Sequence, residues 1–153
     1  MKRVGLRAIG IAVLLSVGLL TVEQGYADDN DPGQKCTLAT LKGRYLFVGS
    51  GTLLPPAFGV TKQSLFASAG YHIFNGDGTG TDTVTFSIDG VVVLDMFKTP
   101  VSYTVNPDCT GTYFAPGISF DIFIAPSGEE LTVIQKDLGV VGFQAPQKRV
   151  ANH

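Results

Sequence analysis

The chain has 153 residues and a formal net charge of −2, with 44% hydrophobic and 16% charged residues. This length fits one domain with its own hydrophobic core behind a short leader. A mildly acidic chain lacks the clustered Lys and Arg that nucleic acid or an anionic membrane surface requires, so we expect neither as a partner.

Residues 1–27 have the layout of a secretory signal peptide. A basic start precedes an apolar run from Ala8 to Leu20, and Gly25-Tyr26-Ala27 puts small residues at both positions that a signal peptidase reads. The run is shorter than the roughly 20 residues of a transmembrane helix. We therefore expect cleavage after Ala27 and export to the periplasm or the medium. Removal of the leader takes Lys+Arg from 11 to 8 and Asp+Glu from 13 to 12, which leaves a formal charge of −4.

Both cysteines, Cys36 and Cys109, remain in the exported part of the chain. An oxidising compartment favours a disulfide between them. A reactive thiol or a metal site is the weaker alternative, because no C-x-x-C motif occurs and no histidine lies nearby in sequence. A bond would close a loop of about 70 residues, which contributes roughly 4 kcal/mol in the chain-entropy model.

The first elements of the mature chain are short. Residues 28–35 are polar and rich in turn formers, so we expect a flexible lead-in. Residues 37–42 predict one helical turn with Thr37 as its N-cap. Residues 44–48 predict the first strand, and the connection at 52–63 is unusually apolar for a loop.

Two hairpins dominate the middle of the chain. Strands at 64–74 and 79–88 flank the turn Asn75-Gly-Asp-Gly78, and Thr and Ser alternate with apolar residues along the second strand. The stretch 91–105 is too long and irregular for one flat strand, and Pro100 predicts a bend or bulge near its middle. The stretch Tyr103–Phe114 predicts strand, turn and strand, with Cys109 in the turn.

Three further strands are predicted at 118–125, 131–136 and 140–145, and residues 147–153 predict a disordered tail. About eight strands joined by short turns indicate an all-β, antiparallel up-and-down β-barrel over residues 36–146. A two-sheet sandwich remains the alternative, although the long crossover of a Greek key is not visible.

Three stretches together resemble a known group of proteins: Cys36-x5-Lys42-Gly43-x-Tyr45, Asn75-Gly-Asp-Gly-Thr-Gly-Thr81 and Tyr103-Thr-Val-Asn-Pro-Asp-Cys-Thr-Gly-Thr112. They are similar to secreted bacterial proteins of uncharacterised function whose barrels resemble the allene oxide cyclase-like family. The resemblance covers roughly residues 36–142. It implies an eight-stranded calycin-type barrel with a hydrophobic cavity for lipid-like or polyketide-like molecules. None of that family's catalytic positions matches a residue here, so no activity is carried over.

The candidate catalytic residues are His72, Asp82 and Asp121. His72 lies in the second predicted strand and needs a carboxylate partner, Asp82 or Asp121, to act as a general acid or base in a cavity. The alternative, which we favour, is a surface or rim histidine. Asp121 interrupts an apolar strand, and alternation favours an outward position over a buried one that would mark a site.

The candidate ligand-binding residues are apolar. The connection at 52–63 either caps the mouth of a barrel and contacts a ligand or simply plugs the barrel end. The residues expected to contact an apolar molecule are Leu53, Leu54, Phe58, Phe66, Phe86 and Phe120. The glycines of Gly76-x-Gly78-x-Gly80 indicate a hairpin turn, because no helix follows to bind phosphate and no EF-hand spacing surrounds Asp77.

Three functions fit these observations. The first is an exported barrel that binds an apolar small molecule. The second is a cyclase or isomerase with His72 or a buried aspartate as acid or base, and the third is a structural or surface protein with a filled barrel. A cavity with an inward His72 or a buried carboxylate favours the second, and a purely apolar cavity favours the first. No metal or cofactor is predicted, and the oligomeric state stays open.

Overall fold

The structure is a computed structural model that describes residues 35–151. The predicted signal peptide at 1–27, most of the lead-in at 28–35 and residues 152–153 lie outside the described residues. Within them, nine strands follow one another: β1 Gly43–Leu53, β2 Ser64–Phe74, β3 Thr79–Ile88, β4 Val91–Val105, β5 Thr110–Ala115, β6 Ile118–Ile124, β7 Glu130–Gln135, β8 Val140–Gln144 and β9 Gln147–Val150. Two short 3-10 helices, η1 Leu38–Leu41 and η2 Ala57–Gly59, precede β1 and β2.

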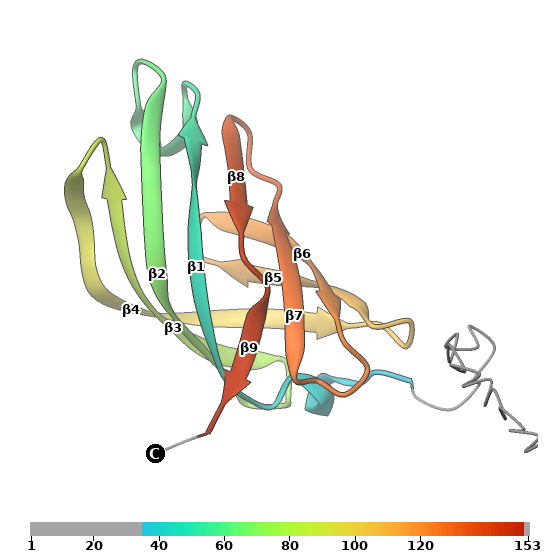
Figure 1. Cartoon of the computed structure of the whole chain (residues 1–153). Helices are drawn as coiled ribbons and strands as arrows, with labels where there is room; N and C mark the ends of the chain where they lie inside the picture. Colours follow the sequence, from blue (N-terminus) through green and yellow to red (C-terminus); the bar gives the residue numbers. More distant parts are fainter. Residues whose placement is uncertain (1–34, 152–153) are drawn as a thin grey trace, which may run out of the picture. The chain divides into compact units, whose positions relative to one another are not determined.

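Eight strands form a closed antiparallel barrel, and β8 lies outside the ring (Figure 1). Each strand from β1 to β6 pairs with the one that follows it, and β9 closes the ring by pairing with both β7 and β1. Among the strands of residues 35–151, β8 pairs with β1 alone, along Gly49–Leu53. The predicted up-and-down barrel is confirmed, and the alternative of two separate sheets is wrong because a single sheet runs around the whole ring.

The C-terminal residues correct one prediction. Instead of a disordered tail, Gln147–Val150 forms β9, and the Gln147 side chain is fully buried. The polar sequence Gln-Lys-Arg hides this strand, because its backbone pairs with Arg44–Leu46 of β1 and with two residues of β7. Backbone pairing needs no apolar side chains, so the composition alone misleads.

The long strand β4 is continuous, and its irregularity does not lie at Pro100. Pro100 pairs in register with Thr81. The register shifts lie farther along the hairpin, at Val84–Ser87 of β3, which face Val92–Phe97 of β4. Met96 in that part has a φ of 44°. Pro100 is tolerated because β5 begins to pair only at Ser102, so the missing N–H has no partner to lose on that edge.

Apolar and aromatic side chains close the barrel at the end that carries η1, which we call the η1 end. Leu41 of η1 and Tyr45 of β1 are fully buried there, against Phe74 and Tyr103. The Arg149 side chain donates to the Tyr45 hydroxyl at 3.1 Å and to the Thr40 carbonyl at 2.7 Å. These contacts hold β9 and η1 against the same end of the ring.

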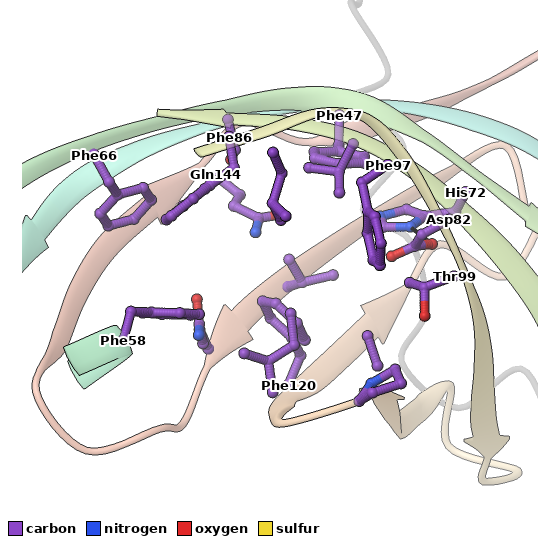
Figure 2. A pocket seen from close by; sticks show the side chains of 18 of the residues that line it. Phe47, Phe58, Phe66, His72, Asp82, Phe86, Phe97, Thr99, Phe120 and Gln144 are labelled. Carbon is purple, nitrogen blue, oxygen red and sulfur yellow. Dashed lines mark hydrogen bonds and ion pairs between the residues drawn. The ribbon is translucent and has the colours of Figure 1, made fainter. Parts of the chain in front are cut away.

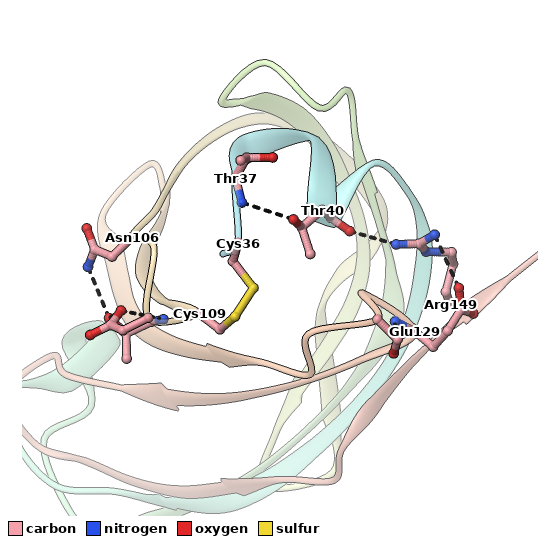
Figure 3. The surroundings of a disulfide bond; sticks show 10 residues. Cys36, Thr37, Thr40, Asn106, Cys109, Glu129 and Arg149 are labelled. Carbon is pink, nitrogen blue, oxygen red and sulfur yellow. Dashed lines mark hydrogen bonds and ion pairs between the residues drawn. A yellow bond between two sulfur atoms is a disulfide. The ribbon is translucent and has the colours of Figure 1, made fainter. Parts of the chain in front are cut away.

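The predicted disulfide joins Cys36 and Cys109, whose Cα atoms are 4.9 Å apart (Figure 3). It ties the segment before η1 to the β4–β5 turn. That turn has the same hydrogen bonds as the β2–β3 turn: in each, an Asp accepts from the backbone and hydroxyl of a Thr two residues later. Gly78 (φ 93°) in one turn corresponds to Cys109 (φ 65°) in the other, so the cysteine occupies a left-handed position that favours glycine.

Candidate functional site

The barrel encloses a cavity of about 500 Å³ that reaches from His72 to Phe58 of η2 (Figure 2). The wall is mostly aromatic and aliphatic. Six phenylalanines line it: Phe47, Phe58, Phe66, Phe86, Phe97 and Phe120. Because the interior is not filled by side chains, the filled-barrel alternative loses the feature on which it was based.

Strand alternation selects which residues reach the cavity. Successive side chains of a strand point to opposite faces, so Phe66 and His72 on β2 share the interior with Asp82 and Phe86 on β3. A Cβ at Gly70, which faces Phe47 across β1 and β2, would lie 2.9 Å from the Phe47 ring. Glycine at this position therefore leaves the room that the Phe47 ring occupies.

A buried histidine, aspartate and tyrosine meet at one end of the cavity, and Ser68, Thr99, Gln135 and Gln144 also line its wall. His72 and Asp82 are register partners on β2 and β3, and both are buried, at 6% exposure each. The His72 Nδ1 atom lies 2.5 Å from Asp82 Oδ1, and the Tyr113 hydroxyl donates to Asp82 Oδ2. We call these three residues the His–Asp–Tyr cluster. Phe58 and Phe66 lie at the opposite end of the cavity (Figure 2).

Tyr113 acts as a donor in this cluster. Burial, and secondarily the Asp82 carboxylate beside it, raise the pKa of the Tyr113 hydroxyl well above its ordinary value of 10.0. The hydroxyl therefore keeps its proton and donates a hydrogen bond to Asp82. With both of its oxygens accepting hydrogen bonds, Asp82 orients His72 in the way that a carboxylate orients a catalytic histidine.

Aromatic rings fix the plane of the His72 imidazole. The Phe47 ring stacks on it with centroids 4.5 Å apart and planes 16° apart, and the Phe74 ring lies 5.5 Å away with its plane inclined by 27°. The Tyr113 ring meets it edge-on at 5.0 Å. A preorganised imidazole of this kind can bind a polar group of a ligand or move a proton without first reorienting.

The cavity meets solvent beside the first half of β4. Val93 and Phe97 line the cavity and are nevertheless 50% and 48% exposed. The described residues place no strand along the free edge of β4 before Ser102, where pairing with β5 begins. Phe58 of η2 is also half exposed at this opening. The mouth is therefore apolar.

The structure brings some predicted residues together and separates others. His72 is buried and faces the cavity, so the surface or rim interpretation is wrong, because even-numbered residues of β2 point inward. Asp82 is its partner. Asp121 lies on the outer face of β6, in an ion pair of 2.7 Å with Lys136, as alternation favoured.

The predicted ligand-binding residues also divide. Phe58, Phe66, Phe86 and Phe120 line the cavity. Leu53 is buried in the small apolar cluster behind Phe66, and Leu54 is exposed outside the cavity. The apolar connection therefore contributes one ring to the mouth, and its leucines serve packing.

Sequence reasoning missed Tyr113 as a site residue. Tyr113 of β5 pairs with Phe120 of β6, and its hydroxyl reaches Asp82 of β3 across the barrel. Tyr113 and Asp82 are 31 residues apart in sequence. The alternation along β5 could have predicted that Tyr113 points inward, on the same face as Ala115. That signal shows the face and cannot show the partner.

Within residues 35–151, no group of three or more His, Cys, Asp or Glu side chains is placed to hold a metal ion. Over the same range, no helix has the length and apolarity needed to cross a membrane. The Gly76–Gly80 stretch forms the β2–β3 turn, in which Asp77 accepts hydrogen bonds from Thr79. Comparisons with protein-family models, curated proteins and solved structures find no match for this chain.

Proposed function

We propose that this protein binds an apolar small molecule inside its barrel. The observation that carries the proposal is the cavity of about 500 Å³, whose walls are mostly phenylalanine and aliphatic side chains and whose one end holds the His–Asp–Tyr cluster. Ligand pockets of small molecules typically measure about 300–1,000 Å³ and combine apolar walls with a few placed polar groups. The half-exposed rings at the mouth give an apolar molecule an apolar entrance.

Native mass spectrometry of the chain expressed with its own leader tests this proposal. We expect an added mass of a small molecule that disappears on denaturation. Ser68 lines the cavity, whereas Ala69, next to it on β2, is exposed. Ser68→Phe should therefore abolish the added mass and Ala69→Phe should keep it. A bare parent chain that also fails to bind an apolar fluorescent probe would overturn the proposal.

A second candidate is a barrel cyclase or isomerase that acts on a lipid-like or polyketide-like substrate. The His–Asp–Tyr cluster favours it, because a buried carboxylate and an inward histidine are what acid–base catalysis in a dry cavity requires. In this function His72 takes a proton from a carbon next to a carbonyl and returns it elsewhere, while Asp82 stabilises the imidazolium.

Proton exchange separates the two candidates. The ligand released from the barrel is incubated with the protein in heavy water, and its carbon-bound deuterium is measured by mass spectrometry. Exchange that His72→Gln removes without loss of binding supports the enzyme. Binding without exchange supports a carrier. The resemblance to the allene oxide cyclase-like family agrees with either outcome.

We also propose that the protein is exported and that the signal peptide is cleaved after Ala27. The Cys36–Cys109 disulfide supports this, because such bonds persist in oxidising compartments. The intact mass of the protein recovered from the periplasm or the medium should correspond to a chain that begins at Asp28. A mass that retains residues 1–27 would contradict it.

A further inference from the structure

The hydrogen bonds of the His–Asp–Tyr cluster determine which atom of His72 faces a ligand. Asp82 accepts from Tyr113 at one oxygen and lies 2.5 Å from His72 Nδ1 at the other. The proton of a neutral His72 therefore sits on Nδ1, between the ring and the carboxylate. The lone pair of the neutral imidazole is then on Nε2.

That Nε2 atom is available to a ligand. His72 lines the cavity and is 6% exposed, yet no described residue forms a hydrogen bond with its Nε2. Two enclosed side-chain atoms of the described residues lack a hydrogen-bond partner, Arg44 Nε and Gln147 Oε1. His72 Nε2 also lacks a protein partner but is not among these enclosed atoms, so it is accessible from the cavity. An acceptor that lies in the cavity without a protein partner is best satisfied by a donor on the ligand.

The charges of the wall disfavour an anion at the same place. Among residues 35–151, no Lys or Arg lines the cavity, and the Asp82 carboxylate lies directly behind the His72 ring. A ligand carboxylate at Nε2 would need a charged imidazolium shared between two anions in an apolar chamber. Like charges in a medium of low dielectric repel strongly, and a buried unpaired charge is costly.

We propose that the occupant is an uncharged, mostly apolar molecule with a hydroxyl group that donates to His72 Nε2, and that free carboxylates of similar size bind poorly. The apolar part lies toward Phe58 and Phe66, which form the end of the cavity opposite His72 (Figure 2). This inference rests on the proposed binding function and adds the chemical class of the ligand.

Displacement of a fluorescent probe tests the class. The uncharged probe N-phenyl-1-naphthylamine is bound to the ligand-free full chain and displaced by 1-decanol, by 1-methoxynonane or by decanoate at about pH 8, where the acid is ionised. The alcohol and the ether have the same number of heavy atoms, but only the alcohol donates. We expect 1-decanol to act at about tenfold lower concentration than either competitor.

The variant His72→Phe should bind the probe and lose the preference for the alcohol, whereas Asp121→Asn, on the outer face, should keep it. Equal displacement by the ether or by decanoate on the parent chain would overturn the inference, and this comparison needs no variant. A preference that survives in His72→Phe would overturn it too. Failure of the parent chain to bind the probe or any of the three molecules would overturn the binding function itself.

Discussion

Replacing both cysteines by alanine should strongly destabilise the barrel. Cys36 and Cys109 are 73 residues apart, and the loop-closure term for that separation is about 4.4 kcal/mol at 25 °C. Domains of this size have free energies of unfolding of about 5–15 kcal/mol, so the loss is a large fraction of the total. The bond also fixes the segment that leads into η1, and Leu41 of η1 packs into the core that closes the η1 end.

Urea unfolding followed by far-UV circular dichroism measures this loss, and tyrosine fluorescence serves as a second probe because the chain has no Trp. With a slope of about 1–3 kcal/mol per molar urea, a loss of about 4.4 kcal/mol lowers the midpoint by roughly 1.5–4.4 M. The parent chain under reducing conditions should match the Cys36→Ala, Cys109→Ala variant. A midpoint change below roughly 0.5 M would refute the loop-closure argument.

A matched variant separates the bond from the backbone strain of the turn. Cys109 has a φ of 65°, where a residue with a Cβ costs about 1–2 kcal/mol. Cys36→Ala combined with Cys109→Gly should therefore be more stable than the double alanine variant by roughly 1 kcal/mol, after the greater chain entropy of glycine. Equal stability of the two variants would show that the turn relaxes without cost.

Three further predictions concern burial and charge. Burial raises the pKa of Tyr113, so the stability that its neutral hydroxyl contributes is complete below pH about 10 and is lost as the pH rises further. In urea unfolding above that pH, Tyr113→Phe should reduce the loss of stability by about 1.4 kcal/mol per pH unit. An unchanged dependence of stability on pH would contradict this. Leu41→Ala should cost about 2–5 kcal/mol in thermal unfolding, because the side chain is fully buried, and a smaller loss would mean that the η1 end is not packed as described. Asp82→Asn should lower the free energy of unfolding by about 1–3 kcal/mol and weaken the binding of 1-decanol. Asp121→Asn should change the free energy of unfolding by less than about 1 kcal/mol and leave binding intact. Equal effects of the two variants would refute the distinction between the inner and the outer carboxylate.

Local patterns predicted much of the fold because they depend on neighbours in sequence. The β2–β3 hairpin has the predicted bounds, since the Asn75–Gly78 turn and the alternation on both sides are local signals. The outward position of Asp121 follows from the same alternation. The strand β9 was not predicted, because its stability comes from pairing with β1 and β7 and not from its own residues.

Sequence patterns alone predicted the all-β class, the meander from β1 to β7, the disulfide and four phenylalanines that line the cavity: Phe58, Phe66, Phe86 and Phe120. They did not predict that β9 closes the ring and that β8 lies outside it. Only the tertiary structure decided that His72 is buried, that Asp82 rather than Asp121 is its partner and that Tyr113 completes the cluster. The physical reason is closure of the ring. Closure brings β5 opposite β2 and β3 and encloses a space, and neither the register across the barrel nor the space between side chains is a property of any local segment.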